Sequence, residues 1–95
     1  MSIEEENLSE ALRALSHHDR RVFVHACGGG ARSAGELSEL SHLSLPSVSE
    51  HLKVLRKSGL LILDRQGRNW MYQTDTELLA EVAAAVQRLG MADGA

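Results

Sequence analysis

Apolar residues recur at the spacing of an α-helix along most of this chain. Within residues 44–60, three of them stand at i, i+4 and i+7 and so share one buried stripe of a helix: Val48, Leu52 and Leu55. Ser44 is a suitable N-cap, Pro46 is tolerated because it falls in the first turn, and Gly59 is a natural stop. The pattern predicts a helix that begins after Ser44 and ends just before Gly59.

Two helices are predicted at the N-terminal end. The first covers residues 3–15, where Ser2 opens a capping-box pattern with the glutamate three residues later and leucines recur at helical spacing. The second covers about residues 19–27 and opens in the same way at Ser16 with Asp19. A run of three glycines ends it.

A short third helix is predicted over residues 34–41. Ser33 with Glu36 supplies its capping box, and Leu37 and Leu40 are expected to point inward. Because only a short link separates this helix from the next one, the two form a helix-turn-helix.

The periodicity changes after Gly59. Residues 61–65 and 70–73 follow a two-residue period, which is typical of β-strands. Residues 66–69 form the turn between them. The result is a hairpin with an arginine on each side of its glycine tip.

A last helix is predicted over residues 75–89, capped by Thr74 and apolar over a wide arc. One face of it can pack on its own domain, and another is left for a partner. The element order α-α-α-α-β-β-α is that of a winged helix-turn-helix, mainly α with a small β-hairpin. We expect a single domain over residues 1–95, with its core over about 3–90 and a frayed tail at 91–95.

Composition excludes several classes of protein. The hydrophobic fraction of 43% is typical of a globular chain. The single cysteine rules out an intrachain disulfide, no stretch has the length of a membrane span, and the acidic N-terminus is unlike a signal peptide. These features predict a cytoplasmic protein. A domain this small is marginal as a monomer, which favours burial of one helix against a second copy.

The distribution of charge points to a polyanionic partner, although the net charge is −3. Between residues 44 and 72, five cationic side chains stand against two carboxylates, a local net charge of +3, so the rest of the chain carries −6. A basic zone on an acidic body is the electrostatic footprint of a nucleic-acid binder.

The exposed side of the helix after Ser44 has a layout typical of DNA reading. Short hydrogen-bonding side chains stand near its N-terminal end, cations stand near its C-terminal end, and the hairpin arginines extend the same zone. The residues predicted to bind DNA are Ser44, Pro46, Ser47, Ser49, Glu50, His51, Lys53, Arg56, Lys57, Arg65 and Arg68.

Some of these residues have a second interpretation. His51 lies between the buried stripe and the exposed side, so it either hydrogen-bonds inside the motif or reaches a phosphate. Glu50 repels phosphates but can accept from cytosine N4, so it is either a specificity element or turned away. Ser44 has helix capping as its simpler role, and the hairpin arginines can be plain solvated charge.

Four segments carry motifs that occur together in one protein family. They are residues 14–20, residues 35–37, the run Ser-x-His-Leu-Lys-x-Leu-x-x-x-Gly-Leu over residues 49–60, and Arg65-Gln66-Gly67-Arg68 with Met71-Tyr72. With these motifs the chain resembles the ArsR/SmtB family of bacterial and archaeal transcriptional repressors. The resemblance spans about residues 8–80.

The resemblance implies a homodimer with double-stranded DNA as its partner. In this family the first and last helices form the dimer interface, the recognition helices enter successive major grooves of a palindromic operator, and the wings approach the flanking minor groove or backbone. The residues expected at the interface are Leu8, Leu12, Leu78, Val82 and Val86, with burial in the core of the single chain as the alternative for each.

The sensor sites familiar in this family do not match the chain. The third helix lacks a Cys-x-Cys pair, and the last helix contains no histidine. We therefore predict no metal and no cofactor, and leave the effector unassigned. One alternative is a metal- or thiol-responsive repressor that uses the region from His17 to Cys27, completed by other segments or by a second subunit.

Two further functions are open to a fold of this kind. One is a winged-helix module that binds another protein through the acidic body. The other is catalysis, which we do not expect, because no Ser/His/Asp order, carboxylate pair or metal triad stands at a spacing typical of an active site.

Overall fold

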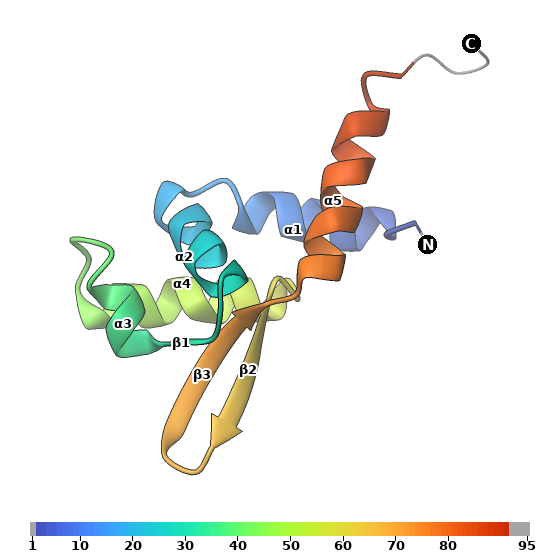
Figure 1. Ribbon diagram of the computed structural model, residues 1–95. Helices are drawn as coiled ribbons and strands as arrows, with labels where there is room; N and C mark the ends of the chain where they lie inside the picture. Colours follow the sequence, from blue (N-terminus) through green and yellow to red (C-terminus); the bar gives the residue numbers. More distant parts are fainter. Residues whose placement is uncertain (1, 92–95) are drawn as a thin grey trace.

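The computed structural model describes residues 2–91 and confirms a mainly helical fold with a small β-hairpin (Figure 1). The predicted tail beyond Met91 lies outside the described residues. The elements are α1 (Glu5–Ala14), α2 (His18–Gly28), β1 (Arg32–Ser33), α3 (Ala34–Ser38), α4 (Leu45–Lys57), β2 (Leu61–Gln66), β3 (Asn69–Thr74) and α5 (Thr76–Arg88).

The core lies where α2, α3 and α4 meet one end of the sheet. The predicted stripe of α4 is confirmed, because all three of its apolar residues are buried. The largest fully buried side chains are Phe23, Cys27, Leu37, Val48, Leu52, Leu55 and Leu60. This core fixes α4 against the body by one side only, which leaves the other side to solvent.

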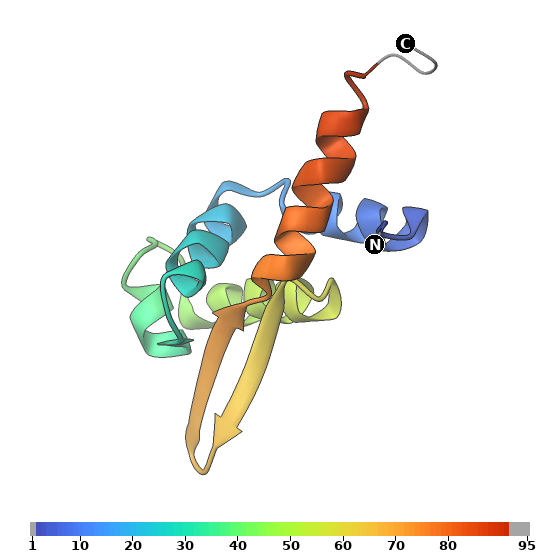
Figure 2. The same ribbon diagram turned by 45° about the vertical axis from the view of Figure 1, so that its right-hand side comes forward.

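The hairpin and α5 project from the helical body in opposite directions, as both views show (Figures 1 and 2). The molecule is correspondingly elongated, with principal extents of 52 × 26 × 22 Å. Helix α1 crosses beside α5 and also contacts α4. None of the helices within residues 2–91 is long and apolar enough to cross a lipid bilayer.

The N-caps predicted for α3 and α4 are confirmed. The Ser44 hydroxyl accepts from the Ser47 amide at the start of α4. At the start of α3, the Ser33 hydroxyl accepts from the Glu36 amide and the Glu36 carboxylate accepts from the Ser33 amide, which completes the capping box. The hydrogen bond from the Ser33 amide, as the first cause, holds the pKa of the Glu36 carboxyl below its usual value.

The caps predicted for α1 and α2 are wrong. Helix α1 begins at Glu5 with Glu4 as its N-cap and no side-chain cap, and Ile3 lies before the helix, where it packs against the core. Helix α2 is capped by His17, whose Nδ1 accepts from the Asp19 amide at 3.2 Å. The Ser16 hydroxyl donates instead to a carbonyl at the end of α1.

The third helix is shorter than predicted. It ends at Ser38, so the link to α4 covers residues 39–44. Leu40 consequently falls in that link and is 51% exposed, contrary to the prediction that it points inward. Leu43 packs against the core in its place.

The sheet contains a third strand that the sequence pattern did not predict. Strand β1 pairs antiparallel with β3 and gives the strand order β1-β3-β2. Thr74 is the last residue of β3 and does not cap α5 as predicted, because its side chain is buried under α2. Asp75 caps α5 and accepts from the Leu78 amide at 3.1 Å.

Candidate nucleic-acid interface

The exposed side of α4 carries most of the residues predicted to bind DNA. Ser47 and His51 are half-buried, and the other members on α4 and its cap are exposed: Ser44, Pro46, Ser49, Glu50, Lys53, Arg56 and Lys57. They lie opposite the buried stripe that anchors the helix. The body of the domain therefore presents this side of α4 to solvent as a single surface.

Hydroxyl groups cluster at the N-terminal end of α4. The Ser44 hydroxyl accepts from the Ser47 amide at 3.4 Å and donates to the Ser47 hydroxyl at 3.1 Å. Ser44 is thus committed to capping, whereas the Ser47 hydroxyl keeps its own hydrogen to donate. A donor of this kind near a helix N-terminus suits a phosphate oxygen or a base edge.

Cations gather at the other end of α4, beside the base of the hairpin. Lys53, Arg56 and Lys57 line a hollow of about 670 Å³ whose opposite wall is formed by residues 61–63 of β2. Asp75 also lines this hollow. Within residues 2–91, the one ion contact under 4.0 Å joins His17 and Asp19, so none of these three cations has a described carboxylate within that distance. A hollow with three cations that lack a close ion-pair partner is suited to a phosphate backbone.

The hairpin, or wing, presents its two arginines in different ways. Arg65 and Trp70 are partners across the two strands, and the Arg65 guanidinium lies 4.4 Å from the centre of the Trp70 ring. This cation–π contact restrains Arg65 on the strand. Gly67 adopts a φ of 63° in the two-residue turn, which leaves Arg68 exposed at the tip. The role of Trp70 as a stacking partner was not visible in the sequence.

His51 joins α4 to the start of α2. Its Nδ1 accepts from Arg20 Nε at 3.0 Å, and its ring centre lies 4.3 Å from that of His17. Arg20 also donates from Nη1 to the carbonyl oxygen of Arg13 at 3.4 Å. Burial, followed by the adjacent His17 and Arg20, lowers the pKa of His51. Sequence reasoning gave Arg20 no role, although it lies in one of the family-like motifs.

The predicted interface residues on α1 and α5 fall into two groups. Leu12 is 40% and Val86 44% exposed, and Leu8 and Leu78 are half-buried. Val82 is 3% exposed and belongs to the core of the single chain, which was the alternative considered for it. The part left uncovered by the single chain is Leu12 on α1 with Val86 on α5, two helices that contact each other, and these two residues are called the apolar strip below.

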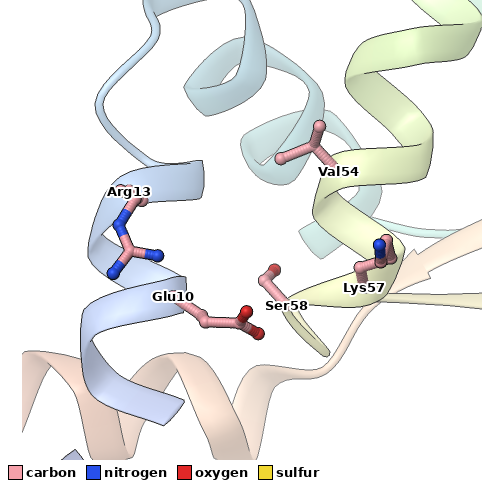
Figure 3. Close-up of a pocket in the computed structure, with 5 residues that line it drawn as sticks. All are labelled: Glu10, Arg13, Val54, Lys57 and Ser58. Carbon is pink, nitrogen blue, oxygen red and sulfur yellow. The ribbon is translucent and has the colours of Figure 1, made fainter. Parts of the chain in front are cut away.

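A charged crevice separates α1 from α4. Glu10 and Arg13 on α1 face Val54 and Lys57 on α4, with Ser58 at its end (Figure 3). Its volume is about 220 Å³, which leaves room for several waters or a small polar molecule. The crevice places groups of both charges between α1 and the helix predicted to read DNA.

The region from His17 to Cys27 does not assemble a metal site within the described residues. No group of three or more His, Cys, Asp or Glu side chains in residues 2–91 lies close enough to hold an ion. His18 and His25 are exposed, whereas Cys27 is fully buried. Burial raises the pKa of the Cys27 thiol to about 11, with Arg32 lowering it and Glu36 raising it by smaller amounts. The thiol is therefore held protonated and out of reach of oxidants.

Comparison with known proteins places this surface in a family. The model of a helix-turn-helix domain matches residues 7–64. The HTH-type transcriptional regulator Rv2034 of Mycobacterium tuberculosis (strain ATCC 25618 / H37Rv) is 38% identical over 79 residues, which cover 82% of this chain and 73% of that protein. The HTH-type transcriptional repressor SmtB of the same strain is 34% identical over 73 residues, but these span only 54% of its length and 77% of this chain.

The fold leads to the same family. The crystal structure of the ArsR family transcriptional regulator RHA00566 superposes with a TM-score of 0.81 at 26% identity and covers 94% of this chain and 92% of that one. The chain belongs to the ArsR/SmtB family. It is a winged helix-turn-helix, DNA-binding transcriptional regulator, as its motifs predicted.

A further structural relative has the same fold. The homodimeric winged helix-turn-helix DNA-binding domain of Mb0332 from Mycobacterium bovis superposes with a TM-score of 0.73 at 23% identity, and covers 88% of this chain and 78% of that one. At this identity the likeness establishes the shared fold of the regulator.

Proposed function

We propose that the regulator represses transcription by binding a palindromic operator as a homodimer. Each α4 lies in a major groove, and each wing follows the flanking backbone or minor groove. The observation that carries this proposal is the row of three cations on α4 that adjoins the wing and has no described carboxylate within 4.0 Å: Lys53, Arg56 and Lys57. Six of them in a dimer give a strongly salt-dependent attraction to DNA.

Different residues contribute affinity and sequence preference. The cations of α4 and Arg68 contact phosphates or the minor groove, where they add affinity for any duplex. Ser47 and Glu50 stand nearer the N-terminal half of α4 and contact base edges, with Glu50 accepting from cytosine N4. Because the Glu50 carboxylate repels phosphates, it favours only sequences that offer it a donor.

The homodimer is supported by the uncovered apolar strip. Leu12 on α1 and Val86 on α5 are 40% and 44% exposed on two helices that contact each other. Pairing these two helices with their counterparts in a second copy would bury both and would set the two α4 helices against one duplex. The Mb0332 domain, which shares this fold, is likewise homodimeric.

A fluorescence-anisotropy titration tests this function. The probe is the DNA upstream of the regulator's own gene, compared with a scrambled duplex of equal length, at two salt concentrations and with a chelator present. We expect preference for the upstream duplex and a steep loss of affinity with salt. Combining Lys53→Ala with Arg68→Ala should weaken binding at least about tenfold and reduce the salt slope by about one for each lost phosphate contact.

The control is Arg88→Ala, which removes one positive charge, where the double variant removes two, from the exposed end of α5, away from the proposed DNA surface. It should leave affinity for DNA nearly unchanged. Normal operator binding by the double variant would show that the proposed surface is wrong. Salt-insensitive binding without sequence preference would favour a protein-interaction module instead.

A further inference from the structure

A hydrogen bond between two side chains ties the DNA-reading helix to the body of the domain. Arg20 on α2 donates from Nε to Nδ1 of His51 on α4 across 3.0 Å, and the two residues lie 31 positions apart. Arg20 also donates to the carbonyl oxygen of Arg13, so it bridges the end of α1 and the middle of α4. Within the described residues, no other side-chain hydrogen bond links α4 to the helices before it.

The bond requires that His51 be neutral. Arg20 can only donate, so Nδ1 of His51 must carry a lone pair and its remaining proton resides on Nε2. A second proton would place an N–H at Nδ1 against the Arg20 N–H and add a positive charge beside a guanidinium. Protonation and the hydrogen bond therefore exclude each other.

The other charged groups around His51 come from two elements. From the start of α2, the His17 ring lies 4.3 Å away, and Asp19 stands with its carboxylate 3.8 Å from Nδ1 of His17. Glu50 adjoins His51 on α4 itself. Both carboxylates favour a charged imidazole, but burial, His17 and Arg20 outweigh them and lower the pKa of His51.

We propose that Arg20 is a positioning residue for DNA recognition: it holds α4 through neutral His51, and a proton on His51 releases the helix and weakens operator binding. This inference rests on the proposed DNA surface, because His51 directly follows Glu50 and lies two positions before Lys53. Contacts to base edges tolerate displacements of only about 0.5 Å, whereas phosphate attraction does not need such accuracy. Losing the bond should therefore cost sequence preference more than overall affinity.

The measurement must separate these two effects. Lowering the pH also makes a protein more positive as a whole and so strengthens its binding to any duplex. The useful quantity is the ratio of affinities for the operator and a scrambled duplex, measured by anisotropy from about pH 8 to pH 5, where histidine changes charge. We expect this ratio to fall about tenfold in the wild-type regulator, while affinity for the scrambled duplex stays level or rises.

Two variants locate the effect. His51→Asn keeps an acceptor bonded to Cγ, as Nδ1 is, but cannot titrate. Its ratio should be independent of pH across the whole range, whatever its value at neutral pH. Arg20→Met removes the donor and keeps a side chain of similar reach, so its ratio should be low at every pH. His18→Asn removes an exposed histidine on the same helix and should follow the wild type.

Three outcomes would overturn the proposal. The ratio of His51→Asn could fall with acid as steeply as that of the wild type, Arg20→Met could retain the wild-type ratio and its pH profile, or the wild-type ratio could be independent of pH. If Arg20→Met fails to fold, ¹⁵N NMR of the wild-type imidazoles provides the second test. The ¹⁵N signal of Nδ1 in His51 must be that of a hydrogen-bond acceptor at neutral pH, and it must be lost when the ring is protonated. A failure of the DNA surface itself shows separately, as normal binding by the Lys53→Ala, Arg68→Ala double variant.

Discussion

Thr74 Oγ1 donates a hydrogen bond to the carbonyl oxygen of Val24 across 2.7 Å, although the two residues lie 50 positions apart. Thr74 is buried where the wing ends and α5 is about to begin, and Val24 lies in the middle of α2. The bond thus fastens the base of the wing to the helical body. It is the structural reason that a residue suited to capping a helix occupies the last position of a strand.

Replacing Thr74 with valine tests this bond. Valine has nearly the same shape but no hydroxyl, so the domain should lose about 1 kcal/mol of unfolding free energy, the usual net worth of such a bond. Urea unfolding followed by circular dichroism measures the loss. Thr74→Ser keeps the hydroxyl and should retain more stability than the valine variant; the reverse order would mean that the methyl group, and not the bond, matters.

Gly59 and Gly67 form a matched pair for testing backbone strain. Both have a left-handed φ, 86° and 63°, which disfavours any residue with a Cβ. A Cβ at Gly67 would meet open space, whereas one at Gly59 would lie 3.0 Å from Cδ2 of Leu78. We expect Gly67→Ala to cost about 1–2 kcal/mol from φ alone. Gly59→Ala should cost about 1 kcal/mol more, because the leucine must shift. If both variants lose the same unfolding free energy in urea, the Leu78 side chain moves away from the new Cβ at no cost.

The parts of the fold that were predictable from sequence are those set by nearby residues. The buried stripe of α4 follows from a period within one helix, and the Ser33–Glu36 capping box joins residues three positions apart. The wing follows from a two-residue turn around Gly67. In each case the stabilising contacts join residues that are close along the chain, so the sequence alone contains the information that predicts the element.

The parts that were not predictable depend on how distant segments meet. Strand β1 has two residues, too few for a period, and exists because β3 passes beside it. His51 was placed on α4 correctly, but its partner Arg20 comes from another helix, and no spacing rule connects them. Trp70 likewise gains its contact with Arg65 only through the register of the hairpin.

The buried thiol of Cys27 should be inert in the native regulator. With its pKa raised to about 11, only about one molecule in a thousand carries a thiolate at pH 8, compared with a substantial fraction of an exposed cysteine. A thiol reagent should therefore react at least about a hundredfold faster after denaturant is added. We also expect treatment with peroxide to leave DNA affinity unchanged. If Cys27 instead reacts rapidly in the folded protein and the reaction releases DNA, the result would support a thiol-sensing role for this residue.

The apolar strip on α1 and α5 gives a direct test of assembly. Leu12 and Val86 are exposed in the single chain, so a charge at either position should leave the domain folded. At a dimer interface the same charge would be buried twice, once from each copy, without a partner. We expect Leu12→Glu and Val86→Glu to sediment as monomers at micromolar concentration with undiminished helical circular dichroism.

Loss of the dimer should also weaken operator binding, because each monomer then engages one half-site alone and the gain from linking two half-sites disappears. Gln87→Glu adds the same charge beside Val86 at an exposed polar position and should leave both the dimer and operator affinity intact. Val82→Glu, by contrast, places the charge in the core of the single chain and should unfold it. If both exposed-site variants remain dimeric, the two copies meet through another surface, and the spacing of the α4 helices on DNA must be derived from that surface.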